Sequence, residues 1–267
     1  MKAFNYIFSI FCFLLVFKVQ GQSGGRTLQE TGLWNGVYLK GRFSEKIGYY
    51  GEHHYRLRNS ESNLNDFIGR NRQIYNRFGL NIYLNPYFEI VVGPALILNF
   101  SPSPGSTRYQ NVTLEPRIWH QWLFSMPSMG RVKLYHQFRF EHRWKKTNEP
   151  DAEYNYTNRY RYKFFAYISL NKPQLQVGTF FFSPSAEIFM QSGKSVISNP
   201  FEDFRTYNGF GYILNKNLTF FAGHMWTVGQ MSNGFEYGTT HILRLNVFIG
   251  FDSRKVENKL PTINMGF

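Results

Sequence analysis

One stretch constrains the fold of this chain more than any other: residues 131–145, with the sequence RVKLYHQFRFEHRWK. Every second residue of it is charged or polar, and the residues between are mostly apolar. A period of two puts these two sets on opposite faces of a β-strand, whereas a helix would spread the charges around its circumference. The run is also longer than an ordinary strand of about 5–6 residues. Long strands with one charged and one apolar face are typical of transmembrane barrels, in which the charge faces the lumen.

The same alternation recurs along the chain and predicts eleven strands. They cover residues 33–40, 46–58, 72–84, 87–100, 109–124, 131–145, 158–170, 174–190, 204–214, 218–228 and 239–251. Tight turns with Asn, Pro or Gly alternate with long polar loops between them. This alternation is expected of membrane barrels, whose periplasmic turns are short and whose outer loops are long.

The strand count raises a question of parity, because bacterial single-chain barrels normally have an even number of strands. Either residues 33–40 are not a full wall strand, or residues 255–267 add a twelfth. The sequence therefore predicts an all-β fold, an antiparallel transmembrane β-barrel of about 10–12 strands with a charged lumen. Whether Phe251 or Phe267 ends the closing strand is left open.

The N-terminus has the features of a secretory signal peptide. Lys2 is followed by an apolar run from Phe4 to Phe17 and then by the small residue Gly21. We expect a signal peptide at residues 1–21 and a barrel domain at residues 22–267. An N-terminal membrane anchor is the alternative, but the run is short for a spanning helix of about 20 residues. Cys12, the only cysteine, lies in this segment, so the mature chain would have no disulfide and no thiol ligand.

Composition and charge agree with an exported barrel. Aromatic residues make up 19% of the chain, which suits strands and membrane-interface girdles. The formal charge is +13, or +11 once Lys2 and Lys18 leave with the signal peptide. Since an exported chain has little access to nucleic acid, we expect no nucleic-acid partner. The expected partners are outer-membrane lipids, lipopolysaccharide and the barrel-assembly machinery, and the expected location is the outer membrane; the oligomeric state is left open.

Several short motifs resemble a known family. They are Gly32-Leu33-Trp34, Tyr55-Arg56-Leu57-Arg58, the run from His136 to Arg143, Arg159-Tyr160-Arg161, and Arg205 with Gly209-Phe210-Gly211-Tyr212. Together they resemble the domain of unknown function 2490 family, outer-membrane barrels of Bacteroidetes-type bacteria. The resemblance implies this architecture for nearly all of the mature chain and implies no activity.

The candidate site is a network of charged side chains in the lumen. Its predicted members are Arg131, Lys133, Arg139, Glu141, Arg143, Arg159, Arg161, Lys163 and Glu115. Buried guanidinium groups need carboxylate partners, and Glu115 is the first choice to separate the arginines of the two strands 131–145 and 158–170. Glu52, Glu89 and Glu187 could also point inward. The network either plugs and braces a narrow barrel or attracts anions into a pore, and both remain open.

A catalytic role is the main alternative to structure or transport. Gln230-Met231-Ser232-Asn233-Gly234 is similar to the His-x-Ser-Asn-Gly motif of outer-membrane phospholipases, but Gln230 occupies the position of the base and cannot accept a proton. The histidines show no spacing typical of metal ligands. We therefore expect no enzyme activity, no metal and no cofactor.

The function predicted from the sequence is an integral outer-membrane barrel with a structural role or a role in the passage of small solutes, with anions favoured. A barrel enzyme acting on outer-membrane lipids, as a phospholipase or lipid A deacylase does, is one alternative. A soluble exported lipocalin-like binding protein is the other. The direction of the aromatic side chains separates membrane barrel from soluble binder, because only a membrane barrel turns them outward in girdles.

Overall fold

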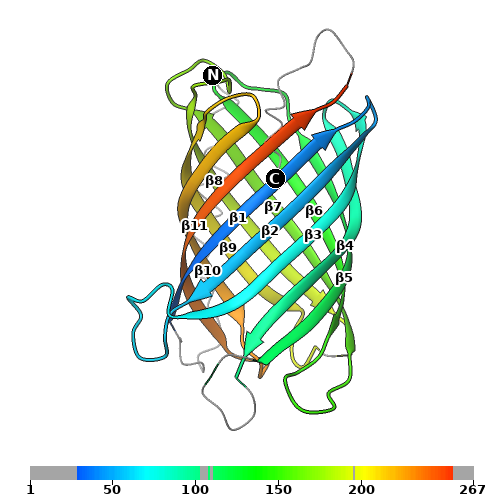
Figure 1. Cartoon of the computed structure of the whole chain (residues 1–267), viewed down its shortest axis with the longest axis vertical. Helices are drawn as coiled ribbons and strands as arrows, with labels where there is room; N and C mark the ends of the chain where they lie inside the picture. Colours follow the sequence, from blue (N-terminus) through cyan, green and yellow to red (C-terminus); the bar gives the residue numbers. More distant parts are fainter. Residues whose placement is uncertain (1–28, 103–107, 109–110, 195, 255–267) are drawn as a thin grey trace.

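Eleven long strands form a closed barrel in the part of the chain that the computed structural model describes, residues 29–102, 108, 111–194 and 196–254 (Figure 1). The strands are β1 (Gln29–Arg42), β2 (Ile47–Arg58), β3 (Arg70–Asn85), β4 (Phe88–Ser101), β5 (Asn111–Ser125), β6 (Val132–Lys145), β7 (Asn155–Ser169), β8 (Phe180–Ser192), β9 (Phe201–Ile213), β10 (Leu218–Gln230) and β11 (Tyr237–Asp252). The described residues include no helix long and apolar enough to cross a membrane. The predicted fold class is confirmed.

The barrel closes through a parallel pair, β1 with β11, which lie side by side in Figure 1. Their register runs from Gln29 opposite Thr239 to Arg42 opposite Asp252, and all other neighbouring strands are antiparallel. In an up-and-down barrel with an odd number of strands, the first and last strands run in the same direction and must pair in parallel. Residues 33–40 therefore belong to a full wall strand. The suggested twelfth strand at 255–267, like the signal peptide, lies outside the described residues.

The strands alternate as the sequence predicts, with charged side chains turned into the lumen. In β6, Glu141 and Arg143 are buried inside, while His136 and His142 lie on the outer face beside apolar neighbours. These two outward histidines need no bulge, because each has a partner across the strand. His136 Nδ1 lies 2.9 Å from the hydroxyl of Tyr162, and His142 Nδ1 lies 2.8 Å from Oδ1 of Asn158.

The connection before β8 differs from the prediction. The sequence predicts a strand from residue 174, but β8 begins at Phe180, and a ten-residue connection at 170–179 replaces the expected tight turn at 171–173. Leu175 packs against the buried core of the barrel, and Oδ1 of Asn171 accepts a hydrogen bond of 2.8 Å from the backbone N–H of Phe180. This segment turns inward over the lumen, which an alternation of residue types does not reveal.

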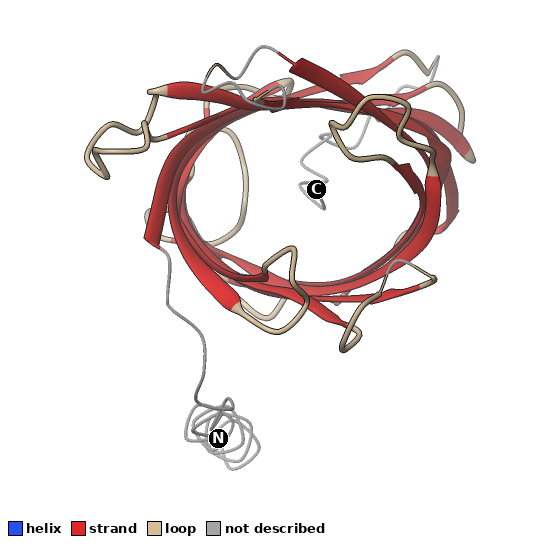
Figure 2. Cartoon of the chain, turned by 90° about the horizontal axis from the view of Figure 1, so that it is seen from below, coloured by secondary structure: helices blue, strands red, loops and turns tan. Residues whose placement is uncertain are grey.

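The core of the molecule is the interior of the barrel, whose strands form a complete ring in the end view of Figure 2. Large aromatic side chains fill much of it, among them Trp119 and Phe181. Phe181 fits because it lies over Gly211 on the neighbouring strand β9. A Cβ at that position would come 2.0 Å from the ring, so only glycine leaves room for this phenylalanine.

Candidate functional site

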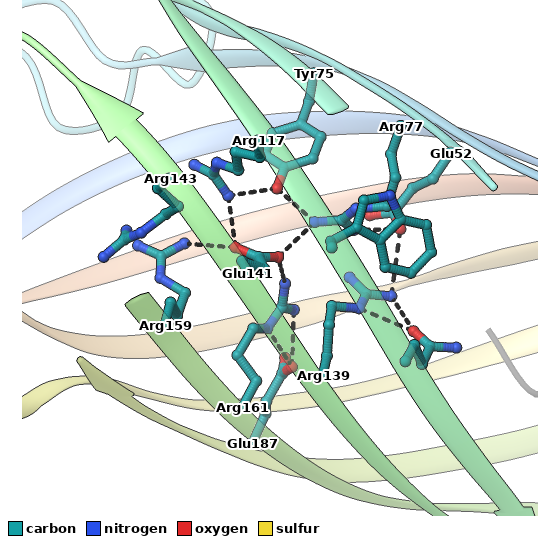
Figure 3. Close-up of polar contacts among 12 residues, drawn as sticks. Glu52, Tyr75, Arg77, Arg117, Arg139, Glu141, Arg143, Arg159, Arg161 and Glu187 are labelled. Carbon is teal, nitrogen blue, oxygen red and sulfur yellow. Dashed lines mark hydrogen bonds and ion pairs between the residues drawn. The ribbon is translucent and has the colours of Figure 1, made fainter. Parts of the chain in front are cut away.

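The charged lumen is organised around one carboxylate, Glu141 in β6. It is 1% exposed, and arginines from three other strands surround it (Figure 3). Arg77, Arg117 and Arg161 donate hydrogen bonds to its oxygens at 2.6, 2.7 and 2.9 Å, and Arg159 forms a longer ion pair at 3.5 Å. One carboxylate cannot neutralise four guanidinium groups. The remaining charge has to be balanced by other acidic side chains.

Two glutamates from β8 and β9 supply part of that balance. Glu202 at the start of β9 accepts hydrogen bonds from Arg143 at 2.9 Å and from Nε of Arg159 at 2.6 Å. Glu187 in β8 accepts a hydrogen bond of 2.9 Å from Arg161. These contacts cross from strand to strand and tie β6 through β9 together on the inside of the barrel.

A third glutamate extends the network to the opposite wall. Glu52 in β2 accepts a hydrogen bond of 2.6 Å from Arg77 and forms an ion pair of 3.4 Å with Arg139. Arg139 also donates to the side-chain oxygen of Gln121 in β5. The side chain of Arg77 is fully buried and bridges Glu52 and Glu141, so strands on both sides of the lumen are joined through it.

The structure places Arg139, Arg143, Arg159 and Arg161 in this network around Glu141, and Arg139 stands directly opposite Arg161 as expected from antiparallel pairing. Like charges in that position repel, and the carboxylates beside them offset the repulsion.

Glu115 has a smaller part than expected. It forms an ion pair of 2.8 Å with Arg117 on its own strand and contacts none of the arginines of β6 or β7 at ion-pair distance among the described residues. The glutamates that separate those arginines are Glu141, Glu187 and Glu202. The expectation that Glu115 fills this role is wrong, because alternation gives the face of a side chain and not the strand that lies across the lumen from it.

Two further predicted members lie at the other end of the barrel. Arg131 precedes β6, is exposed, and donates a hydrogen bond of 2.7 Å to the carbonyl of Leu170. Lys133 lies near Tyr87 and Tyr135, with its Nζ 5.8 and 5.9 Å from the two ring centres. Neither touches the network around Glu141, so their assignment to it is corrected. Their position in the sequence places them at the turn end of β6, where Lys133 is about 26 Å along the strand from Glu141.

Lys163 lies inside the barrel near the network. It stands opposite Glu187 in the pairing of β7 with β8, and its Nζ lies 4.7 Å from the ring centre of Phe165.

Three central residues were not among the predicted site residues: Arg77, Arg117 and Glu202. The alternation of β3 puts Arg77 on the same face as Tyr75, and Arg117 is two residues from Glu115, so both could have been found from their strands. Glu202 was missed because the predicted strand begins at residue 204, whereas β9 begins at Phe201.

The lumen contains a large cavity at each end, and a small pocket of about 20 Å³ between them is lined by Tyr38, Lys163 and Phe248 among others. The cavity at the end of the long loops has a volume of about 570 Å³. Twelve arginine and lysine side chains line it against six carboxylates, so it has an excess of six positive charges. The cavity at the turn end has a volume of about 730 Å³ and includes the buried ion pair of Lys40 with Glu89. No described residue lines both cavities.

A layer of buried side chains separates the two cavities. Tyr50, Trp119, Phe165 and Phe181 are each at most 1% exposed. The indole of Trp119 donates hydrogen bonds to the backbone carbonyls of Phe78 and Pro94, and its ring centre is 4.7 Å from the guanidinium of Arg77. The charged network therefore lies directly against an aromatic layer between the two large cavities.

The segment that resembles a lipase motif is a turn between β10 and β11. The amide of Gln230 donates a hydrogen bond of 3.0 Å to the carbonyl of Gly234, and Ser232 is exposed. His224 lies on the outer face, where its Nε2 is 3.1 Å from Nδ1 of His241. Within the described ranges, no group of three or more His, Cys, Asp or Glu side chains is arranged to hold a metal ion.

Fold and site together define a closed β-barrel with a charged lumen. The chain belongs to the family described as Protein of unknown function (DUF2490), whose model matches residues 31–237. No curated protein matches the chain in sequence. Among solved structures, the NanC porin in a rhombohedral crystal form is similar, with 11% identity and a TM-score of 0.46. The match covers 80% of this chain and 90% of that one.

Proposed function

We propose that this protein is an integral outer-membrane barrel whose lumen is closed at its middle and accepts small anions at its loop end. The membrane location is supported by the outer face of the barrel. Large apolar side chains are exposed there on strand after strand, for example Phe78 and Leu80 in β3 and Leu243 and Leu245 in β11. Exposed apolar surface of this extent is costly in water and favourable in lipid.

Orientation follows from the connections. The turns after β1, β3 and β9 are short, and short turns face the periplasm in outer-membrane barrels. The positively charged cavity then opens toward the outside. Export through the signal peptide at residues 1–21, contact with outer-membrane lipids and lipopolysaccharide, and insertion by the barrel-assembly machinery belong to the same proposal.

The role of the lumen rests on one observation, the excess of six positive charges around the cavity at the loop end. A confined cavity of one sign concentrates ions of the other sign and repels cations. The buried layer around Trp119 supports a closed rather than an open lumen. Passage of an anion across the barrel would require this layer to rearrange.

Catalysis is not part of the proposal. In the part of the chain that the structure describes, no base lies next to Ser232, since the side chain of Gln230 cannot accept a proton and His224 is turned to the outer face beside His241.

Membrane fractionation tests the location. Expressed in a Gram-negative host, the mature chain is expected in the outer-membrane fraction and needs detergent for extraction. Its unboiled form is expected to migrate differently from its boiled form on a gel, because a closed barrel has no free strand edge from which to unfold. Recovery of a soluble periplasmic monomer would instead support the lipocalin-like alternative.

A further inference from the structure

The indole of Trp34 in β1 lies in the cavity at the loop end, surrounded by arginines. Trp34 is 3% exposed and lines this cavity. The guanidinium carbons of Arg56, Arg205, Arg72 and Arg244 lie 3.9, 5.6, 5.9 and 5.9 Å from its ring centre. Four cations around one ring are an unusual concentration of charge, even allowing for the attraction of guanidinium groups to aromatic faces.

Two of these arginines have acidic partners. Arg205 forms an ion pair of 2.5 Å with Asp203, and Arg72 lies 3.8 Å from a carboxylate oxygen of Glu30. Asp203 therefore offsets the charge of Arg205, whereas Arg72 shares Glu30 with Arg58, which lies 3.6 Å from the same carboxylate.

Arg56 and Arg244 have no acidic partner at ion-pair distance among the described residues. Arg56 donates a hydrogen bond of 2.9 Å to the amide oxygen of Gln73, and Arg244 donates one of 2.8 Å to the hydroxyl of Tyr38. Both partners are neutral. Two positive charges on either side of Trp34 thus face the cavity with no carboxylate at ion-pair distance among the described residues.

Hydrogen-bond donors are also left over at the same place. The Nε1 atom of Trp34 and the Nε atoms of Arg56 and Arg244 are buried and have no acceptor within the described structure. Buried donors are almost always paired in folded proteins. Three unpaired N–H groups beside two unbalanced charges call for a ligand that is negatively charged and rich in acceptor oxygens.

We infer that Arg56, Arg244 and Trp34 form a binding site for a single oxyanion, a phosphate or carboxylate group of a free solute. Guanidinium groups match the geometry of these groups with pairs of parallel hydrogen bonds. The volume of about 570 Å³ leaves room for the body of a small organic anion beside the bound group. The site deepens the proposed function and rests on it, since the solute enters through the loop end of the barrel.

Calorimetric titration of the detergent-solubilised full chain with inorganic phosphate, and separately with acetate, tests the site. Saturable binding of one phosphate per chain is expected. Arg56→Gln and Arg244→Gln are each expected to weaken it about tenfold or more, because each removes a charge-assisted hydrogen bond. Both variants should fold, since neither substitution leaves a carboxylate unpaired; the shift between boiled and unboiled forms on a gel verifies this.

Lys133→Gln is the matched control. It removes the same charge from the lumen but lies in the cavity at the turn end, on the far side of the aromatic layer. It should leave phosphate affinity within about twofold of the unmodified chain. If Lys133→Gln and Arg244→Gln weaken phosphate binding equally, the affinity depends on net charge alone. That result would refute the site but not the proposal that the lumen accepts anions.

Absence of saturable binding for both phosphate and acetate would overturn the site. A second titration with lipopolysaccharide micelles separates free from lipid-borne phosphate. Binding of lipopolysaccharide alone, lost in Arg56→Gln and Arg244→Gln, would assign these arginines to a lipid headgroup and refute the free-solute site. Membrane fractionation tests the location of the barrel independently. A failure of the proposed membrane location can therefore be distinguished from a failure of the proposed binding site.

Discussion

Glu141 is the residue on which the charged lumen depends most, because four arginines share it. Glu141→Gln keeps the shape of the side chain but removes the charge that these buried guanidinium groups face. We expect a loss of about 3–5 kcal/mol in the free energy of unfolding, as for other buried ion pairs that lose one partner. Urea unfolding of the detergent-solubilised barrel, followed by tryptophan fluorescence, measures it.

Two other substitutions serve as comparisons for the loss of stability in Glu141→Gln. Glu115→Gln should cost about 1–3 kcal/mol, because Arg117 keeps its bond to Glu141. Glu61→Gln should cost less than about 1 kcal/mol, since the side chain of Glu61 is 67% exposed and its ion pair with Arg70 is screened by water. If all three substitutions cost the same, the lumen is wet around Glu141 and the network does not brace the barrel.

A substitution of Ser232 tests whether the turn between β10 and β11 is structural or catalytic. Ser232→Ala is expected to leave the phospholipid and lipid A composition of the outer membrane unchanged, because no described side chain is placed to take the proton of its hydroxyl. Mass spectrometry of lipids from cells expressing either form measures this. Lipid hydrolysis that disappears with the substitution would restore the enzyme alternative.

At the scale of the strands, the parallel pair of β1 and β11 is the feature that sets the strand count. Val37 and Val247 stand opposite each other there and both face outward. Adjacent strands lie about 4.8 Å apart, within the range that a disulfide spans. We expect Val37→Cys combined with Val247→Cys to form an intramolecular disulfide on mild oxidation, seen as a change in mobility after boiling without reductant.

The control pair is Val37→Cys with Leu243→Cys. Leu243 faces outward on the same strand but is shifted by four residues, about 13 Å along the strand, which is too far for a disulfide. Cross-linking of the control pair in place of the matched pair would show a different register. Failure of both, in a barrel that still folds, would be the result expected of a twelfth strand between β1 and β11.

Most of the strands could be predicted from the sequence, because their side chains alternate between the apolar outer face of the barrel and its lumen. The start of β8 could not, since the fold of 170–179 depends on Leu175 reaching the core. Nor could the parallel pair of β1 and β11, because the sequence left open whether the number of strands is odd or even. Periodicity also placed Arg139 and Arg161 on one face, but the partners of Glu141 include Arg77, which is 64 residues away on a strand across the lumen.

At the scale of the whole molecule, the barrel is a closed ring of strands with a large cavity at each end of its lumen, and we propose that the lumen is closed between them. The charged network lies against the aromatic layer, where the ring of Trp119 is 4.7 Å from the guanidinium of Arg77 and 5.6 Å from the ring of Tyr50. The ion pairs thus join strands of the wall beside this layer. The central claim about function is our proposal that a small anion enters the cavity at the loop end and does not cross the molecule.

Conductance of single barrels in a planar lipid bilayer tests that claim most directly. The unmodified chain is expected to give no steady, ohmic channel, whereas Trp119→Ala combined with Phe181→Ala removes two of the largest buried side chains and should give a channel that favours chloride over potassium. Unboiled gel migration verifies that the variant is folded. Long-lived conductance steps from the unmodified chain, as large as those of the variant, would contradict the closed lumen.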